Sequence, residues 1–355
     1  MHKLKSVTIE VTAKCNLKCA HCYIADYKEL TLACDVIIDL LRSLKKLGCQ
    51  EVNISGGEPL LYPDLGRIIK EANRLKLNLG ILRTNGTLIN KLNLSLLKSF
   101  KQVAISLDGH IKQLHEELRG INTYYKVINA LSLLDEHGFH TAIVTMIRPT
   151  NIDKLIEMYE FLSKFETIKV WELGLIRPTG RAKNHIKDYY VEIQNLLQRL
   201  NDLISYIART GGKIKVIMGT LVELLEMKKN TIIPTNLSLP TKFLELSPCG
   251  YRSSLYIKPD GSVHYCQLMS EVAPHISFLG NILKEDIKDI WINRYPASKQ
   301  LKLKLKDLKT CIKCKYISVC GGGCRAFALL YKDDLYAPDP ISCKVMKNLE
   351  GGANK

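Results

Sequence analysis

The spacing of the cysteines constrains this 355-residue chain more than any other feature. Three of its twelve cysteines lie in the stretch Cys15-Asn-Leu-Lys-Cys19-Ala-His-Cys22. Spacing this tight is typical of iron–sulfur ligation: three thiolates on one loop can hold three irons of a [4Fe–4S] cube and leave the fourth iron open to a small molecule. Seven more cysteines lie in the last third of the chain, at Cys249, Cys266, Cys311, Cys314, Cys320, Cys324 and Cys343.

The compartment of the chain bears on how these cysteines are used. The opening residues, Met1-His2-Lys3-Leu4-Lys5, lead directly into a strand pattern and leave no room for a signal peptide. No apolar run is long enough for a membrane span. We therefore expect a cytoplasmic location and no membrane contact. Cysteines in such a chain favour metal ligation, with disulfides as the alternative.

The formal net charge of +16 indicates a basic surface. Such a surface can attract nucleic acid, an acidic peptide or an acidic electron donor of the ferredoxin or flavodoxin type. The densest basic run, residues 299–315, lacks the interleaved aromatics of a single-strand binding surface. Solvated lysine faces are therefore favoured over a nucleic-acid site.

Strands and helices are predicted to alternate over about residues 7–176. Apolar residues at helical spacing predict a helix over Cys34–Leu47 and another opened by Pro63, and a third is predicted over 188–208. Alternation of this kind predicts parallel strands joined by right-handed crossovers. The predicted strands are Val7–Thr12, Glu51–Ser55, Leu77–Arg83, Gln102–Asp108, Thr141–Ile147 and Ile168–Ile176.

Within these strands, apolar residues alternate with polar or small ones, whereas parallel strands are usually apolar on both faces. The fold class predicted is α/β: a partial (β/α)6 TIM-type barrel with a wet interior, followed by a small, irregular, cysteine-rich domain. Glu10 and Glu172 are predicted to point inward. They are candidates for acid–base work or substrate binding, and the alternative is that they simply hydrogen-bond inside the barrel.

Four segments are predicted along the chain. Residues 1–185 form the barrel core, and residues 186–248 form a helical bridge and linker. The cysteine-rich domain covers 249–347, where periodicity weakens and metal can replace a large core. A tail covers 348–355.

The three-cysteine loop follows the first predicted strand, and Gly56-Gly57-Glu58-Pro59 ends the second. With these two motifs, residues 5–180 resemble the radical S-adenosylmethionine (SAM) enzymes. The resemblance implies a [4Fe–4S] cluster whose open iron binds SAM, and cleavage of SAM to a 5′-deoxyadenosyl radical that abstracts hydrogen from an unactivated C–H bond. It also implies that the turn at Gly56, Gly57 and Glu58 binds the methionine part of SAM.

Other positions resemble cofactor-binding residues of the same family. His21 stands at the usually aromatic position near the adenine, and Ser106 resembles the serine that contacts the ribose. Arg119 resembles the arginine that pairs with the cofactor carboxylate, with a surface arginine as the alternative. Asp108 is a further cofactor-binding candidate, with a turn aspartate before Gly109 as the alternative.

A later half-motif, Arg177-Pro-Thr-Gly180-Arg181, follows the sixth predicted strand. It resembles the segment that closes the cofactor site in peptide-modifying and haem-pathway members of the family. The alternative is an ordinary loop after a barrel strand.

Residues 249–347 resemble the seven-cysteine SPASM domain, which implies two auxiliary [4Fe–4S] clusters. The family pattern assigns Cys249, Cys266 and Cys324 to the first cluster, and Cys311, Cys314, Cys320 and Cys343 to the second. The competing interpretation is a pair of zinc sites, since Cys311 and Cys314 alone would suit zinc.

The first auxiliary cluster therefore has three cysteines for four ligand positions. We expect its fourth position to be non-cysteine or exchangeable, and a substrate thiolate can occupy it. The two remaining cysteines, Cys34 and Cys49, are predicted to be buried packing residues because one begins a helix and the other precedes a strand.

The resemblance implies a radical SAM enzyme that oxidatively modifies a peptide or protein side chain. Tetrapyrrole side-chain chemistry of the haem-pathway type is an alternative, so the substrate is a peptide or a small molecule. A non-catalytic iron–sulfur or zinc scaffold is another alternative. Because the chain begins close to its first predicted strand, we expect a peptide to need a separate recognition protein or direct docking, and cobalamin chemistry is disfavoured.

Overall fold

The computed structural model describes residues 3–24, 29–218, 253–297 and 302–351. At its centre is one curved sheet in the order β10-β9-β8-β1-β2-β3-β4-β5-β6-β7. The strands are β1 (Ser6–Glu10), β2 (Glu51–Ser55), β3 (Asn78–Thr84), β4 (Phe100–Ser106), β5 (Thr141–Ile147), β6 (Ile168–Leu175), β7 (Lys215–Met218), β8 (Ser254–Ile257), β9 (Ser262–His264) and β10 (Phe278–Asn281).

Strands β1 to β7 are all parallel, and β8 joins them in parallel on the other side of β1. The β8–β9 and β9–β10 pairs are antiparallel. Within the described residues β7 and β10 are the two ends of the sheet. The barrel is therefore partial, and the α/β prediction is confirmed.

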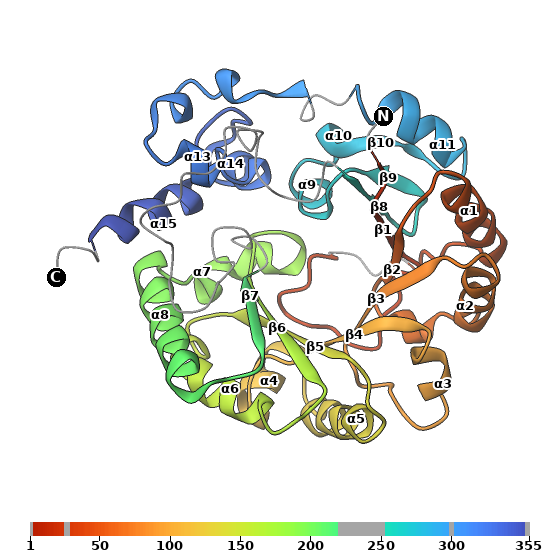
Figure 1. The fold of residues 1–355 in the computed structure, drawn as a ribbon, viewed down its shortest axis with the longest axis horizontal. Coiled ribbons are helices and arrows are strands. Elements are labelled where there is room, and N and C mark those ends of the chain that lie inside the picture. Colours follow the sequence, from red (N-terminus) through yellow and green to blue (C-terminus); the bar gives the residue numbers. More distant parts are fainter. Residues whose placement is uncertain (1–2, 25–28, 219–252, 298–301, 352–355) are drawn as a thin grey trace.

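Helices lie outside the arc of strands (Figure 1). Those of the first half are α1 (Cys34–Lys46), α2 (Leu65–Arg74), α3 (Leu94–Leu97), α4 (Lys112–Arg119), α5 (Tyr124–Glu136), α6 (Leu155–Leu162), α7 (Ile186–Tyr189) and α8 (Ile193–Thr210). The C-terminal part holds α9 (Gln267–Val272), α10 (Pro274–Ser277), α11 (Ile287–Asp289), α13 (Ile317–Cys320), α14 (Arg325–Lys332) and α15 (Pro340–Gly351). In the described residues no helix is both long and apolar enough to cross a membrane.

The six strands expected from alternation are all present, with ends shifted by at most two residues. The helix over Cys34–Lys46 ends one residue earlier than predicted, and α2 begins two residues after Pro63. The third predicted helix is α8, which starts at Ile193 and is ended by Gly211 in the left-handed region at φ 67°.

Four strands were not predicted. Strand β7 lies in the segment expected to be a helical bridge, and β8 to β10 lie in the region where periodicity weakens. Each has only three or four residues, too few for a period of two to stand out. The first part of the cysteine-rich region thus continues the barrel sheet. The end of the predicted bridge and Cys249 lie outside the described residues.

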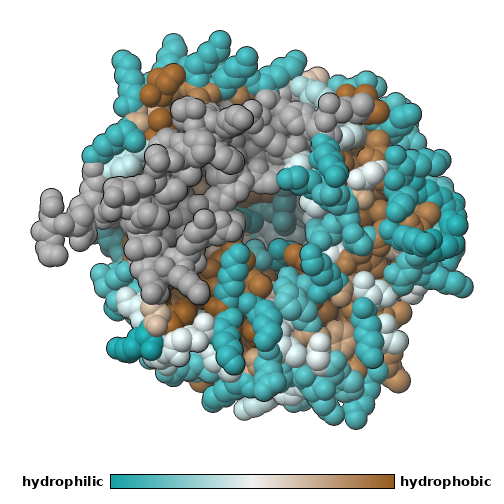
Figure 2. Space-filling view, viewed as in Figure 1, coloured by the Kyte–Doolittle hydropathy of each residue, from teal (hydrophilic) through white to brown (hydrophobic). Residues whose placement is uncertain are grey.

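The predicted division between an apolar outer face and a polar or small inner face is present in the sheet. On β1, Val7 and Ile9 are fully buried under the helices, while Thr8 is partly exposed on the other face. Register places Glu172 of β6 level with Val144 of β5 and Ser106 of β4. Polar groups such as Glu172 and Ser106 therefore face the interior, and Figure 2 shows a hydrophilic hollow near the centre of one face of the molecule.

Candidate active site

The three-cysteine loop, Cys15 to Cys22, follows β1 at its carboxyl end, the edge where barrel enzymes place their active sites. Cys19 is buried and the other two thiols are half-buried. The loop is turned back on itself by a hydrogen bond from the Cys22 amide to the Cys19 carbonyl, at 3.3 Å. The Leu17 amide donates to Cys15 Sγ at 3.4 Å, which directs a dipole at this thiol.

The two glycines of the turn after β2 lie directly against the backbone that leads into the cysteine loop. The Gly57 amide donates to the Thr12 carbonyl at 2.7 Å, and the Glu58 amide donates to the Lys14 carbonyl at 2.8 Å. A Cβ on Gly57 would lie 2.3 Å from Lys14 O, and one on Gly56, whose φ is +148°, would lie 2.4 Å from Thr12 O. Only glycine allows this approach, so the two motifs form one unit.

Glu58 is fully buried, and its carboxylate binds protein groups. It accepts hydrogen bonds from Thr84 Oγ1 at 2.7 Å, from the Asn85 amide at 2.8 Å and from the Leu60 amide at 3.1 Å. Burial raises the pKa of Glu58. Its side chain joins the ends of β2 and β3 and positions the glycine turn.

Asp108 and Arg119 form a buried ion pair next to the cysteine loop. Arg119 Nε donates to Asp108 Oδ2 at 2.6 Å, and Arg119 Nη1 lies 4.0 Å from Cys19 Sγ. Burial opposes ionisation of the carboxyl, but the guanidinium outweighs it and lowers the pKa of Asp108 to about 2. Arg119 is therefore a buried cation held beside a cluster thiol, which rules out the surface-arginine alternative.

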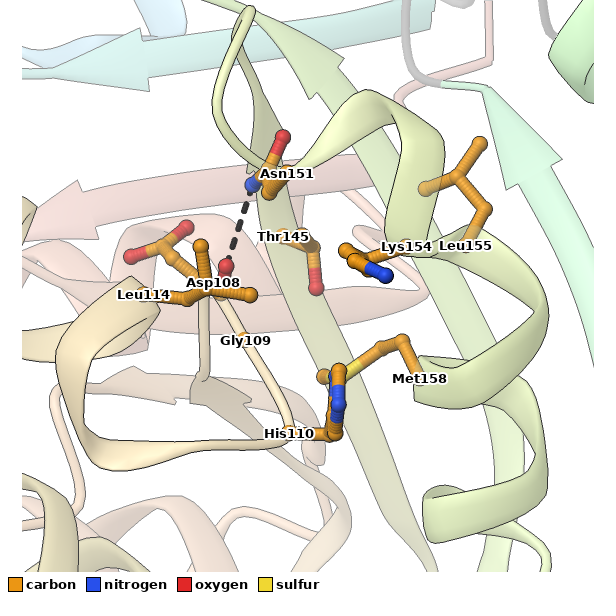
Figure 3. Close-up of a pocket in the computed structure, with 9 residues that line it drawn as sticks. All are labelled: Asp108, Gly109, His110, Leu114, Thr145, Asn151, Lys154, Leu155 and Met158. Atoms are coloured by element: carbon orange, nitrogen blue, oxygen red, sulfur yellow. Dashed lines mark hydrogen bonds between the residues drawn. The ribbon is translucent and has the colours of Figure 1, made fainter.

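The backbone around Asp108 is also fixed. The Met146 amide donates to Asp108 Oδ1 at 2.7 Å, and Asn151 Nδ2 donates to the Asp108 carbonyl at 3.0 Å (Figure 3). A pocket behind this segment is lined by Asp108, Gly109, His110, Leu114, Thr145, Asn151, Lys154, Leu155 and Met158. Thr145 belongs to the outer face of β5, so this pocket is separate from the barrel interior.

His21 lies in the same environment. Its Nδ1 is buried without a hydrogen-bond partner in the described residues. Burial, together with the charge of Arg119, lowers the pKa of His21 to about 3, so the imidazole is neutral. Ser106 ends β4 on the inner face and is partly exposed there. The structure thus gathers His21, Ser106, Asp108 and Arg119 near the carboxyl ends of β1 and β4.

The loop after β6 closes over the cysteine loop. Arg181 Nε donates to the Cys19 carbonyl at 2.8 Å, and the Arg181 amide donates to the Cys22 carbonyl at 2.9 Å. Gly180, at φ +55°, packs so closely that a Cβ would lie 2.3 Å from Cys22 O. Gly180 and Arg181 therefore clamp the cysteine loop, and this segment is not an unattached loop.

Glu10 is buried between two tyrosines. Tyr23, just past the cysteine loop, and Tyr256, on β8, both donate to Glu10 Oε1. Burial raises the pKa of Glu10 and outweighs the effect of these two hydrogen bonds. The carboxyl joins the cysteine loop to the first strand of the C-terminal part, which agrees with the hydrogen-bonding alternative for Glu10.

Glu172 has a different environment from Glu10. It forms an ion pair with Arg83 of β3, with Nη1 and Oε2 3.0 Å apart. Strands β3 and β6 are not neighbours in the sheet, so the pair spans the barrel interior. The two side chains remain 40% and 30% exposed. They are accessible from the hollow and can meet a bound molecule.

In the C-terminal part, the described cysteines form a second group. Burial raises the pKa of Cys320 to about 12, and the charges of Cys343 and Cys311 add to the rise. Cys343 interacts in the same way with Cys311 and Cys314. These interactions place Cys311, Cys314, Cys320 and Cys343, which we call the four-cysteine group, in the same part of the structure. Cys266 directly precedes α9 as its N-cap residue, and its predicted partner Cys249 lies outside the described residues.

Cys34 and Cys49, the two remaining cysteines, lie in the main hydrophobic core. Cys34 is the first residue of α1, and Cys49 Sγ donates to the Glu51 carbonyl at 3.4 Å. Both are packing residues, as predicted.

Two residues of the candidate site were not predicted from the sequence. Arg83 is one, because a charged residue inside a mostly apolar strand resembles an edge position. Asn85 is the other: its Nδ2 lies 3.9 Å from Cys15 Sγ and 2.9 Å from Asn16 Oδ1. Asn85-Gly86 directly follows β3, and a polar residue at the end of a parallel strand is the signal that could have identified it.

The donor set fits iron–sulfur clusters. Burial raises the pKa of Cys15 to about 11, and Cys19 and Cys22 add to the rise. The metal-free Cys15 thiol therefore holds its proton, and a bound metal would release it. No three His, Cys, Asp or Glu side chains in the described ranges group closely enough to hold a single metal ion. Cys15, Cys19 and Cys22 would hold one cube, and the four-cysteine group would hold another.

Together the partial barrel and the three-thiol loop define an enzyme built around a metal cluster. Residues 9–162 match the Radical SAM superfamily, and residues 249–315 match SPASM, an iron–sulfur cluster-binding domain. The chain belongs to the radical SAM superfamily and carries a SPASM domain. Its cofactors are [4Fe–4S] clusters and SAM, and bound SAM would supply a 5′-deoxyadenosyl radical for hydrogen abstraction.

Relatives of known function are similar over almost the whole chain. Mycofactocin maturase MftC of Mycolicibacterium smegmatis is 28% identical, covering 94% of this chain and 81% of its own. Fe-coproporphyrin III synthase of Methanosarcina barkeri is 25% identical, covering 96% and 88%. Among solved structures, Streptococcus suis SuiB bound to precursor peptide SuiA has a TM-score of 0.78 at 21% identity, covering 96% of this chain and 76% of SuiB. This last likeness concerns the fold.

Proposed function

We propose that this enzyme oxidatively modifies a side chain of a peptide or protein. The observation that carries the proposal is the presence, in one chain, of the three-cysteine loop and the four-cysteine group. Removing a hydrogen atom leaves a substrate radical, and oxidation then requires that one electron and one proton leave the substrate. A [4Fe–4S] cluster held by the four-cysteine group would accept that electron. The similarity to a mycofactocin maturase supports a peptide substrate.

The cofactor site we propose combines two kinds of residue. His21, Gly56, Gly57, Ser106 and Arg119 face the bound SAM. Asp108 and Glu58 act on it through other residues, since Asp108 orients Arg119 and Glu58 fixes the glycine turn. Water is excluded from this region by the clamp of Gly180 and Arg181 over the cysteine loop.

The substrate site we propose is the polar part of the barrel interior near Ser106 and Glu172. Arg83 and Glu172 are its charged groups, and a peptide can present a carboxylate to one and an amine or amide to the other. Because the sheet has free ends at β7 and β10 in the described residues, the interior is not closed by strands all the way round.

Tetrapyrrole side-chain chemistry is a second proposal, favoured by the similarity to Fe-coproporphyrin III synthase. A single comparison separates the two substrates. The reconstituted enzyme, SAM and reductant would be incubated anaerobically with a peptide encoded beside the gene, or with an iron tetrapyrrole precursor of iron coproporphyrin III. We expect 5′-deoxyadenosine to form in proportion to a peptide product that has lost two hydrogens. A porphyrin product with an unchanged peptide would overturn the peptide proposal.

A further inference from the structure

The basic run singled out in the sequence lies beside the four-cysteine group. Residues 302–315 contain six lysines and one acidic residue, Asp307. The run places its apolar side chains inward and its lysines outward: Leu303 and Leu308 are buried, while Lys306 and Lys309 are exposed. The short 3-10 turns Leu305–Asp307 and Cys311–Lys313 contact each other, so the lysines and the cysteines occupy one surface.

The single acidic residue of this run offsets only one of its six lysine charges. Asp307 Oδ2 accepts a hydrogen bond from the Lys304 amide at 2.8 Å, which fixes the carboxylate against its own backbone. The lysines that flank it, Lys306 and Lys309, extend into solvent. The local surface therefore has a positive potential, which is strongest at low salt.

One thiol of the four-cysteine group opens onto this surface. Cys311 is buried, but Cys314 is exposed, and the residues between them, Ile312 and Lys313, are exposed as well. Ile312 is 48% exposed, so a small apolar contact lies among the lysines. An exposed thiol ligand, an apolar contact and surrounding positive charge are features of a surface where an electron can pass to another protein.

We propose that Lys306, Lys309, Ile312, Lys313 and Cys314, here called the lysine face, dock a small acidic one-electron carrier protein. The carrier, in its oxidised form, accepts the electron that leaves the substrate, and the substrate proton passes to solvent. Complementary charge speeds such an encounter, and interfaces for electron transfer are small and weak, so a few lysines carry much of the attraction. The direction of the electron rests on the proposed function, whereas the docking does not.

Electron transfer without substrate tests the docking separately from the proposed function. The anaerobically reconstituted chain would be reduced, freed of reductant and mixed with an oxidised, acidic [2Fe–2S] ferredoxin in a stopped-flow instrument. We expect K306Q/K309Q/K313Q to slow ferredoxin reduction by about ten-fold at low salt, and the difference to shrink as salt rises. Oxidation by neutral benzoquinone should proceed at the same rate in both proteins.

The matched control removes three exposed lysines from the barrel helices and their ends, K70Q/K98Q/K126Q, and so changes the net charge equally. This variant should reduce ferredoxin at nearly the unmodified rate. Calorimetric binding of the same ferredoxin should weaken only in the lysine-face variant. Equal slowing in both variants, or no slowing in the lysine-face variant, would overturn the proposal.

Discussion

Arg119 lies between Asp108 and the thiol of Cys19, 2.6 Å from the carboxylate and 4.0 Å from the sulfur. The carboxylate is completely buried, so the guanidinium has an internal counter-ion before any ligand arrives. This arrangement fixes a cation at the edge of the three-cysteine loop.

Removing this counter-ion should lower both the folding free energy and the affinity for SAM. In Asp108→Asn the buried Arg119 loses its charged partner, and we expect a loss of about 3 kcal/mol of folding free energy, with weaker SAM binding. Anaerobic thermal melting and equilibrium dialysis with SAM measure the two effects. Asp64→Asn is the matched control, because the Asp64–Arg67 pair is exposed and should contribute little to the folding free energy. Equal melting of the two variants would contradict this role for Asp108.

Substitution of Gly57 should damage the first cluster specifically. A Cβ there meets backbone oxygens of Lys14 and Ala13 at 2.3 and 2.5 Å, so Gly57→Ala must displace the chain leading to Cys15. We expect iron content after reconstitution to fall by about a third of the twelve irons of three cubes, and 5′-deoxyadenosine formation to be lost. Gly66→Ala in α2 is the control, because the added Cβ meets only Leu96 Cδ2 at 3.6 Å. This variant should keep both its iron content and its 5′-deoxyadenosine formation.

The buried carboxyl of Glu10 should make stability depend on pH. Its pKa in the folded protein is raised by burial, so the folded state holds the proton more tightly than the unfolded state. The stability that this carboxyl contributes is therefore fully present below the ordinary glutamate value of about 4.3 and is lost as pH rises through the raised pKa. Glu10→Gln should remove this dependence while preserving an acceptor for Tyr23 and Tyr256.

Melting temperatures of the two proteins between about pH 5 and pH 8 check this sign. The same variant tests the catalytic interpretation of Glu10. If Gln at position 10 preserves stability but stops product formation, the carboxyl takes part in proton transfer. Unchanged turnover shows that Glu10 only joins the cysteine loop to β8.

The Arg83–Glu172 pair should contribute to substrate binding. Arg83→Glu and Glu172→Arg singly leave like charges facing each other, whereas the double exchange restores an ion pair of reversed direction. We expect the double variant to recover the melting temperature and substrate-free SAM cleavage. Its kcat/KM for the peptide should stay about ten-fold or more below the unmodified value, because a charged contact contributes about 1.5–3 kcal/mol. Full recovery of kcat/KM would show that the Arg83–Glu172 pair stabilises the fold and does not bind the substrate.

Much of this fold could be predicted because its signals are local. Apolar alternation in Val7, Ile9 and Val11 identifies β1, and helix periodicity identifies α1. The glycine turn and the cysteine loop were also identified from the sequence as motifs. The contact between them was not predicted, because Gly57 meets Lys14 only when strands β1 and β2 pair in the sheet.

The rest depends on contacts between distant segments. Tyr256 reaches Glu10 across 246 positions of sequence, and no local pattern encodes such a contact. Arg83 and Glu172 meet because the sheet curves, which places non-neighbouring strands opposite each other. Asp108 was expected near the cofactor, but its pairing with Arg119 depends on how α4 packs against the end of β4.

The most direct test of the central proposal separates SAM cleavage from substrate oxidation. Cys311→Ala/Cys314→Ala removes two thiols of the four-cysteine group and leaves the three-cysteine loop intact. Assayed with SAM, reductant and peptide, this variant should still form 5′-deoxyadenosine but release no oxidised peptide by mass spectrometry. Normal yields of the peptide product would contradict the proposed path for the substrate electron and leave the four-cysteine group a structural role.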